Sequence, residues 1–302
     1  MFMHKIIKRL GLLLIFLSLA ACQDRENPQT QMEIPNKITI AQMSNDVNEN
    51  VPSLHTQFVE HLTQELGIEV EEVETSIYAI GVEALARGEV DILQVTPMSY
   101  YLAKEKTDVS LLATTSREVE YYSSFIARSD NTELNTLEDL KGHTIAFVNP
   151  GSTSGFLYPK ATLVKELKLE SNRFEQSGYF FDQIAYSGNH NTSVIGVTMG
   201  DYDAAAVASS YLPRYEEAGL IEKGELKEIG RTINIPNPAY VMRENWPESF
   251  KQAVSDAFLS FENEAYFEAL YDDPTTRFIK AEDTHFDEAI ELLDMIDAIE
   301  GE

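Results

Sequence analysis

The sequence predicts an α/β protein in which two successive units of strands and helices form two lobes. The first unit spans residues 37–95 and alternates strand, helix, strand, helix and strand, which favours a parallel sheet with right-handed crossovers. A second run of strands and helices begins at Tyr122, with no low-complexity linker before it. The chain has 302 residues, of which 43% are hydrophobic, so it is long and apolar enough for about two domains with ordinary cores.

The first unit has clear strand and helix boundaries. Lys37–Met43 alternates apolar and polar residues and predicts a strand, and Ser53 is a candidate cap for the helix that follows. Gly67 stands where that helix should stop. Apolar residues at four-residue spacing form one face of this helix: Leu54, Phe58, Leu62 and Leu66.

The pattern then repeats within the same unit. Ile68–Val73 predicts a second strand, and Val90–Val95 predicts a third. Between them we expect a helix that ends at Gly88, with an apolar face of Ile77, Ile80 and Ala84.

The second unit is predicted from shorter patterns. Glu248 follows Trp246-Pro247 and opens a helix, and the last sixty residues are expected to be mainly helical. The other expected elements are strands at Tyr122–Ala127, Thr144–Val148, Ala204–Val207 and Ala239–Met242, helices at Tyr158–Leu167 and Asn191–Met199, and a final helix with the apolar face Phe286, Ile290, Leu293 and Ile296.

The charge of the chain excludes some classes of partner. There are 50 acidic and 23 basic residues, which gives a formal net charge of −27. Such a surface repels nucleic acid, whose affinity for proteins depends on neutralising phosphates. A small anion would be bound against this field, so its site must be local and rich in hydrogen-bond donors.

The first residues have the pattern of a secretory signal. Three basic residues precede a short apolar run that ends in Ala20, Ala21 and Cys22. The run is too short for an ordinary membrane span, and Cys22 is the only cysteine in the sequence. This segment resembles a bacterial lipoprotein signal, which implies cleavage after residue 21 and lipidation of Cys22. Residues 22–36 are polar and are expected to form a flexible tether.

A serine- and threonine-rich turn is the strongest candidate for a binding site. Asn149–Gly155 follows a predicted strand and precedes a predicted helix. Ser152, Thr153 and Ser154 add three hydroxyls to the free N–H groups of a helix start, which is an arrangement that binds anions. It is not a nucleotide-binding P-loop, because the glycine-lysine pair is missing. A simple helix cap is the alternative interpretation.

Other candidates follow the same logic. His190 lies between a predicted strand and a helix and could donate to an oxyanion, although a lone histidine is more often structural. Ser99 and Tyr100 follow the strand Val90–Val95, and Tyr78 follows the strand before it, at the carboxyl ends where ligands bind in such sheets. Asp203 precedes the strand Ala204–Val207, and a role in a turn is its alternative.

Together these segments resemble the phosphate/phosphite/phosphonate substrate-binding protein family of ABC importers. The resemblance runs from about Lys37 to Asp287. The matching stretches are Leu137–Gly142, Ala146–Gly155, Ser187–Ser193, Gly200–Val207 and Ile235–Asn237.

The resemblance implies a type II periplasmic-binding-protein fold, in which two lobes are joined by a hinge of crossing strands. The lobes would be residues 37–118 with 236–302, and residues 119–235. It implies anion contacts from Ser152, Thr153, Ser154 and His190, and hydroxyls from Tyr78 and Tyr100. Asp203 matches an acidic position that faces a cationic tail or a protonated oxyanion. The partners would be a small phosphorus oxyanion, the ABC permease subunits and, through the lipid anchor, the outer face of the bacterial cell membrane; we expect a monomer.

Other functions remain open at the level of sequence. A hydrolase or transferase would need an activated nucleophile, and no Gly-x-Ser-x-Gly elbow is present. The histidines lack metal-ligand spacing, so we expect neither a metal nor a cofactor. A binding protein for another small anion or organic acid is the main alternative, and a surface lipoprotein that senses or adheres is another. Within the phosphorus class, phosphonate, phosphite, hypophosphite, phosphate and methylphosphonate are all compatible with the sequence.

Overall fold

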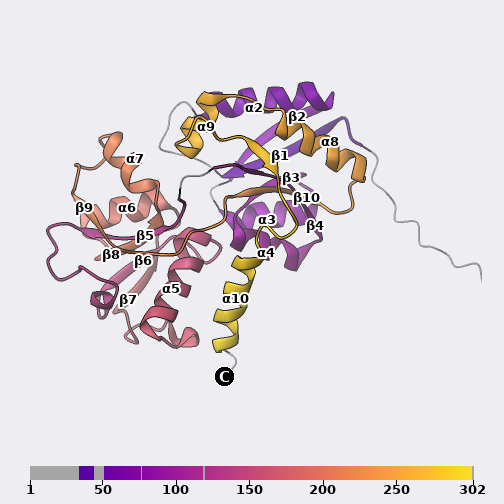
Figure 1. The fold of residues 1–302 in the computed structure, drawn as a ribbon. Helices are drawn as coiled ribbons and strands as arrows, with labels where there is room; N and C mark the ends of the chain where they lie inside the picture. The colour runs from indigo at the N-terminus through magenta and orange to yellow at the C-terminus, as the bar shows by residue number, and fades with distance from the viewer. Residues whose placement is uncertain (1–33, 44–50, 76, 118–119, 301–302) are drawn as a thin grey trace, which may run out of the picture. The chain divides into compact units, whose positions relative to one another are not determined.

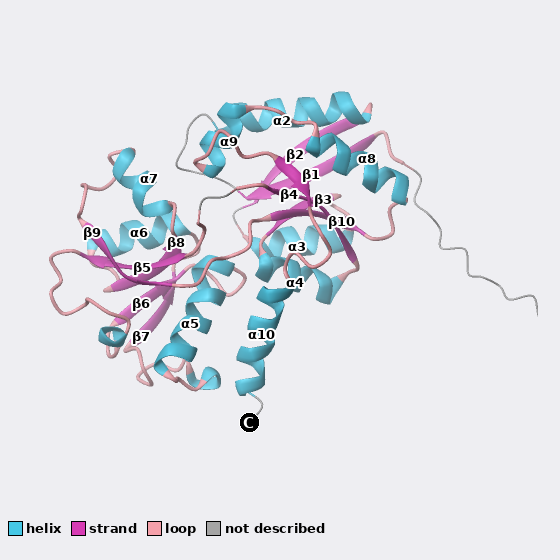
Figure 2. Cartoon of the chain, in the orientation of Figure 1, coloured by secondary structure: helices cyan, strands magenta, loops and turns pink. Residues whose placement is uncertain are grey.

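The computed structural model describes residues 34–43, 51–75, 77–117 and 120–300 (Figure 1). Cys22 and the rest of the predicted signal lie outside these residues. In the described part of the chain, two β-sheets are each covered by helices (Figure 2).

The first sheet has six strands in the order β11-β4-β10-β3-β1-β2. β1, β2 and β3 are parallel, as the alternating strand-helix pattern predicts. β10 runs antiparallel between β3 and β4, so a segment from late in the chain completes a sheet that begins near residue 37. The strands are β1 (Lys37–Met43), β2 (Glu69–Thr75), β3 (Ile92–Val95), β4 (Val109–Thr115), β10 (Ala239–Arg243) and β11 (Phe278–Lys280).

Helices cover both faces of this sheet. α2 (Val51–Leu66) contacts α8 (Glu248–Leu259) and α9 (Glu264–Tyr271), while α3 (Tyr78–Arg87) and α4 (Pro97–Lys106) contact each other on the opposite face (Figure 2). On the α2 face, the buried ring of Phe58 is surrounded by aromatic rings within 6.4 Å, those of Tyr240, Phe258, Phe261, Tyr266 and Phe278.

The second sheet has five strands in the order β7-β6-β8-β5-β9. β6 is parallel to β7 and β8, and β5 is antiparallel to β8 and β9. The strands are β5 (Ser123–Arg128), β6 (Thr144–Phe147), β7 (Gln183–Tyr186), β8 (Ala204–Ala208) and β9 (Leu226–Arg231). They are accompanied by α5 (Tyr158–Leu167), α6 (His190–Met199) and α7 (Tyr211–Glu217), and by the short helices η1 (Glu138–Leu140), η2 (Thr153–Leu157) and η3 (Ser171–Arg173).

The chain crosses between the sheets twice, after β4 and after β9. The two crossings are hydrogen-bonded to each other, because Ile235 N–H donates to the Tyr121 carbonyl (2.6 Å). The Asn237 side-chain amide donates to the carbonyls of Thr115 (3.1 Å) and Arg117 (3.2 Å). These paired segments correspond to the predicted hinge of crossing strands.

The last helix, α10 (Asp287–Glu300), packs against elements from both sheets. It contacts α4 beside the first sheet and α5 beside the second. Its Ala289, Leu293 and Ile296 lie in one apolar cluster with Leu157 and Tyr158 of the second sheet's helices. The predicted lobe boundary assigns residues 236–302 to the first lobe, but α10 contacts elements on both sides of that boundary.

Two predictions about these helices are wrong. The expected apolar face of α3 is not its buried face, because Ile77 and Ile80 are exposed and the buried residues are Gly81, Val82 and Leu85. Ser53 does not cap α2, because that helix already begins at Val51 and Ser53 lies in its first turn. The predicted helix stops are correct: Gly67 and Gly88 have φ of +66° and +75°, values that glycine adopts without the steric cost of a Cβ atom.

Candidate functional site

The serine- and threonine-rich turn is held by its own side chains. Asn149 Oδ1 accepts a hydrogen bond from Gly151 N–H (2.9 Å), and Ser152 Oγ accepts one from Gly155 N–H (3.0 Å). η2 forms a single wide turn after Ser152, and the regular helix α5 begins at Tyr158, as predicted from the sequence. Pro159 fits this position because the first turn of a helix does not need its N–H group.

Thr153 connects this turn to the first sheet. Its side chain is fully buried. Its Oγ1 accepts a hydrogen bond from Met98 N–H (2.8 Å), in the first turn of α4, and donates to Thr96 Oγ1 (2.9 Å). The hydroxyl therefore satisfies a helix N–H group that has no partner within its own helix. These hydrogen bonds therefore join the serine- and threonine-rich turn, beside the second sheet, to the start of α4, beside the first sheet.

Ser154 lies between a tyrosine and a histidine. Tyr121 donates its hydroxyl to Ser154 Oγ (3.1 Å), and His190 Nε2 lies 3.4 Å from the same oxygen. A serine oxygen that accepts from both neighbours keeps its own proton for donation. The side chains of Ser152, Thr153 and Ser154 are thus all hydrogen-bonded, that of Ser152 within the turn and the other two to residues around the site.

His190 is a neutral hydrogen-bond donor in this arrangement. Ala208 N–H donates to its Nδ1 (3.2 Å), so the proton of the neutral ring is on Nε2, the nitrogen nearer Ser154. Burial lowers the pKa of His190 to about 4, which keeps the ring uncharged at neutral pH. The ring of Tyr211 covers it at a centroid distance of 4.6 Å.

These groups meet at a pocket of about 150 Å³. Its lining comes from both sheets and from the crossing segments: Tyr78, Gln94, Thr96, Arg117, Tyr121, His190, Ala208, Ser210, Tyr211, Pro238, Leu270 and Tyr271. Among these described lining residues, none is an aspartate or a glutamate. Burial raises the pKa of Tyr78 and of Tyr121 above the usual range, so both phenols remain protonated donors. The pocket is therefore lined by hydrogen-bond donors and suits a small, acceptor-rich ligand.

The predicted site residues are only partly brought together. Tyr78 and His190 line the pocket, while Ser152, Thr153 and Ser154 lie directly behind its lining. The sequence analysis did not single out Arg117, Tyr121 or Tyr211, which also line it.

Three predicted residues lie elsewhere. Ser99 Oγ accepts from Thr96 N–H (2.8 Å) and completes the start of α4. Tyr100 is buried in the core, with its ring 5.0 Å from that of Phe286. Asp203 lies at the amino end of β8, whereas His190 lies at the carboxyl end of that strand. The Asp203 carboxylate accepts a hydrogen bond from Thr144 N–H (2.9 Å). None of the three is among the pocket-lining residues.

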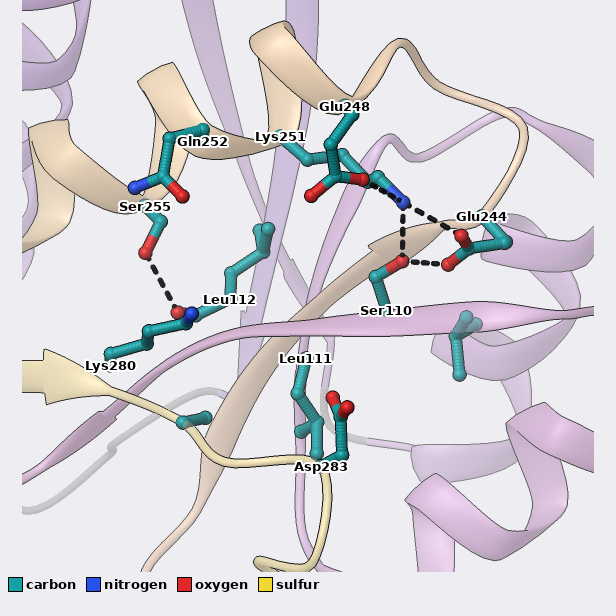
Figure 3. Close-up of a pocket in the computed structure, with 12 residues that line it drawn as sticks. Ser110, Leu111, Leu112, Glu244, Glu248, Lys251, Gln252, Ser255, Lys280 and Asp283 are labelled. Carbon is teal, nitrogen blue, oxygen red and sulfur yellow. Dashed lines mark hydrogen bonds and ion pairs between the residues drawn. The ribbon is translucent and has the colours of Figure 1, made fainter.

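A second pocket, of about 330 Å³, lies between β4 and α8 and is larger (Figure 3). Among its described lining residues, Lys251 is the charged side chain that is buried, and its ammonium contacts Ser110 Oγ (2.9 Å), Glu244 (2.8 Å) and Glu248 (3.0 Å) (Figure 3). A lysine has three N–H donors, so these partners use all of them. This pocket is less suited to an anion than the smaller one, because its lining includes the carboxylates Glu244, Glu248 and Asp283 and the donors of Lys251 are already used.

Two further classes of site receive no support in the described residues. Those residues contain no cluster of three or more histidine, cysteine or acidic side chains that could hold a metal ion. They also contain no helix that is long and apolar enough to cross a membrane.

Comparisons with known proteins agree with this architecture. The structure superimposes on a binding-protein component of an ABC phosphonate transporter from Pseudomonas aeruginosa with a TM-score of 0.74, at 20% identity over 87% of each chain. It also superimposes on PhnD1 from Prochlorococcus marinus in complex with methylphosphonate, with a TM-score of 0.72 at 20% identity, over 87% of this chain and 99% of that one. The two-lobed type II periplasmic-binding-protein fold is thereby confirmed.

The sequence comparisons identify the family. The phosphate-import protein PhnD of Mycolicibacterium smegmatis is 28% identical over 229 residues, which are 74% of this chain and 70% of that protein. A family model described as "ABC transporter, phosphonate, periplasmic substrate-binding protein" matches residues 40–286. Since the match covers most of the sequence, the chain belongs to this family of periplasmic substrate-binding proteins of ABC transporters.

Proposed function

We propose that this protein captures a small phosphorus oxyanion, of the phosphonate or phosphite type, in the pocket beside His190 and delivers it to the permease subunits of an ABC importer. The observation that carries the proposal is the neutral His190, whose Nε2–H is set as a donor by the Ala208 N–H on its other nitrogen. Ser154 accepts from Tyr121 and keeps its own hydroxyl proton, which is a further donor beside this nitrogen. Hydrogen bonds from such donors to a charged acceptor are stronger than neutral ones.

The relatives support the ligand class. One is described as a phosphate-import protein, and another was crystallised with methylphosphonate. The pocket agrees with these ligands in kind, because it is small and is lined by donors. Another small anion or an organic acid is the alternative ligand class.

A catalytic role for the same residues is disfavoured by the histidine tautomer. A general base acting on Ser154 would need an unprotonated nitrogen facing that hydroxyl, with a third group orienting the ring. His190 instead points its protonated Nε2 at Ser154, and its Nδ1 accepts a backbone N–H rather than donating to a carboxylate. The geometry of His190 and Ser154 therefore suits ligand binding better than nucleophilic catalysis, and we propose no catalytic residues.

Isothermal titration calorimetry of the protein from residue 34 onward tests the ligand class. The panel contains phosphite, hypophosphite, methylphosphonate and phosphate, with sulfate and succinate as non-phosphorus controls. We expect at least one phosphorus oxyanion to bind more tightly than either control by a factor of ten or more. Tighter binding of succinate or sulfate would favour the alternative class.

Ser154 should contribute to affinity through its hydroxyl. Ser154→Ala removes the oxygen that links Tyr121 to His190, and with it a donor to the ligand. We expect the affinity for the best phosphorus ligand to fall about tenfold, or about 1.4 kcal/mol, close to the lower end of the usual contribution of a hydrogen bond to a charged group. Calorimetry at neutral pH measures the change.

The matched control is Thr198→Ala on α6. The Thr198 hydroxyl bonds only to the Val194 carbonyl of its own helix (3.0 Å), so its loss should leave affinity unchanged. Equal affinity of Ser154→Ala and the parent protein would remove this turn from the proposed site.

Lipid anchoring is the second part of the proposal. Membership of a periplasmic family supports an extracytoplasmic location. The N-terminal pattern that ends at Cys22, with residues 22–36 as a polar tether, adds attachment to the cell membrane through a lipidated cysteine. Residues 37–118 with 236–302 and residues 119–235 are proposed as the two lobes, and the strands of the two sheets divide between these ranges. The working form is proposed to be a monomer.

Replacing Cys22 tests the anchor. In cells that express the full chain, Cys22→Ala should abolish lipidation and move the protein from the membrane fraction to the soluble extracytoplasmic fraction, or leave the signal uncleaved. Fractionation with immunoblotting, and metabolic labelling with a fatty acid analogue, follow both effects. Ser18→Ala, within the apolar run, is the control and should behave as the parent does. A Cys22→Ala protein that is still labelled and processed would contradict the anchor.

A further inference from the structure

Arg117 is a buried cation in the wall of the pocket. It lies on the crossing segment after β4, and only 8% of its side chain is exposed. Its guanidinium is 5.7 Å from the ring centroid of Tyr121, whose hydroxyl bonds to Ser154. Its Nε atom is buried and has no hydrogen-bond partner among the described residues. A buried N–H group of this kind is costly unless a further acceptor is supplied.

The carboxylate nearest to Arg117 is already engaged. Asp272 receives two hydrogen bonds from Arg214, at 3.1 and 3.0 Å, in a bidentate pair. Arg117 Nη2 lies 3.7 Å from the same carboxylate, which is beyond hydrogen-bond distance. The neighbouring Asp273 accepts from the backbone N–H and hydroxyl of Thr275, at 2.8 and 2.6 Å. Arg117 thus shares the Asp272 carboxylate, which is 43% exposed, with Arg214, and no carboxylate of the described residues is hydrogen-bonded to its Nε atom.

A guanidinium does not lose its proton under ordinary conditions, so Arg117 cannot remove the cost of its unpartnered Nε–H group by becoming neutral. An oxyanion in the pocket would supply both an acceptor for Nε–H and a compensating charge. A ligand ammonium group would have the opposite effect, because it would add a second cation where the described lining residues include no aspartate or glutamate.

We infer that Arg117 is the charged ligand contact of this site, and that the pocket selects oxyanions without a cationic substituent, such as methylphosphonate or phosphite, over zwitterionic aminoalkylphosphonates. This inference rests on the proposed function and names the ligand class more narrowly. It differs from what the sequence resemblance implies, which is anion contacts from hydroxyls and His190, with Asp203 facing a cationic tail or a protonated oxyanion.

The test measures the affinities of the parent protein and three variants for four ligands by calorimetry. Propylphosphonate and 2-aminoethylphosphonate are equal in size and differ in charge, and methylphosphonate and phosphite are the small ligands. The parent protein should bind propylphosphonate at least tenfold more tightly than 2-aminoethylphosphonate. Arg117→Gln should weaken methylphosphonate and phosphite at least thirtyfold, and Arg117→Lys should recover part of that loss because it restores a charge. Arg87→Gln, at an exposed position of α3, makes the same change in net charge and should bind as the parent does.

The outcomes separate the inference from the proposed function. Near-ultraviolet circular dichroism and urea midpoints establish that each variant is folded, and Arg117→Lys provides a second test if Arg117→Gln does not fold. If the parent protein binds none of the phosphorus ligands, the proposed function fails. If the parent binds methylphosphonate and folded Arg117→Gln binds it equally well, the role of Arg117 is overturned while the proposed function stands. Tighter binding of 2-aminoethylphosphonate than of propylphosphonate by the parent would overturn the selectivity.

Discussion

Gly155→Ala is expected to lower the free energy of unfolding by about 3 kcal/mol, the upper end of the usual cost of overpacking a core. A Cβ atom at Gly155 would lie 2.3 Å from Val148 Cγ2 and 2.4 Å from Val148 Cβ. Val148 cannot move away easily, because its own backbone N–H donates to the Gly155 carbonyl (3.0 Å). The added methyl would therefore push the binding turn off the end of β6, so we also expect ligand affinity to be lost.

Urea denaturation followed by circular dichroism measures the change in stability, with Gly151→Ala as the matched control. A Cβ atom at Gly151 would come no closer than 3.3 Å to its neighbours, so that variant should lose much less stability. If the two alanine variants unfold at the same urea concentration, the turn does not depend on the close packing of Gly155 against Val148.

The buried His190 should make the protein less stable as the pH falls below about 6.5. Its pKa in the folded protein is about 4, whereas an unfolded histidine has an ordinary pKa of about 6.5. Between these values the unfolded chain binds the proton and the folded protein does not, so acid favours unfolding. The stability contributed by keeping His190 neutral is complete above about pH 6.5 and is lost as the pH falls towards 4. The full difference in pKa corresponds to a loss of about 3 kcal/mol in the free energy of unfolding. About 2 kcal/mol of this is lost between pH 7 and pH 5.

Urea titrations at pH 7 and pH 5 on the parent protein and on His190→Gln isolate this contribution. The two proteins share every other ionisable group, so the informative quantity is the difference between the two pH profiles. The His190→Gln protein should lose about 2 kcal/mol less than the parent between these pH values. Parallel profiles would mean that His190 is not held neutral by burial.

Much of the fold follows from local patterns in the sequence. The alternation in Lys37–Met43 and the two glycine helix stops define the β1-α2-β2-α3-β3 unit, because period and backbone conformation are local properties. The binding turn is also local, since a strand, a glycine and a run of hydroxyl residues are consecutive in the chain. The start of α5 at Tyr158 follows from Pro159, which fits the first turn of a helix.

The pocket-lining residues that were not predicted from the sequence have no such local signal. Arg117 and Tyr121 lie on a crossing segment without periodicity, and they reach the pocket only because this segment pairs with residues 235–237 far along the chain. Tyr211 reaches it by stacking on His190 across the loop after β8. These contacts depend on the assembled tertiary structure.

Asp203 and Tyr100 are different, because stricter use of the same principles would have excluded them. Ligands bind at the carboxyl ends of parallel strands, and Asp203 precedes β8, so it belongs at the amino end. Tyr100 lies one helical turn after Thr96, and helix geometry directs its ring into the core beside Phe286 rather than into the pocket.

The antiparallel strand β10 has a consequence for the order in which the molecule folds. Ala239 must pair with Val95 and with Thr114, which are separated from it by the whole of the second sheet. Closing a loop of that length in a disordered chain carries a large entropic cost. The second sheet reduces that cost, because its strands are contiguous in sequence and Ser124 pairs with Arg231, so its folding brings the two ends of the intervening chain together. We therefore expect the first sheet, although it begins earlier in the chain, to be completed last.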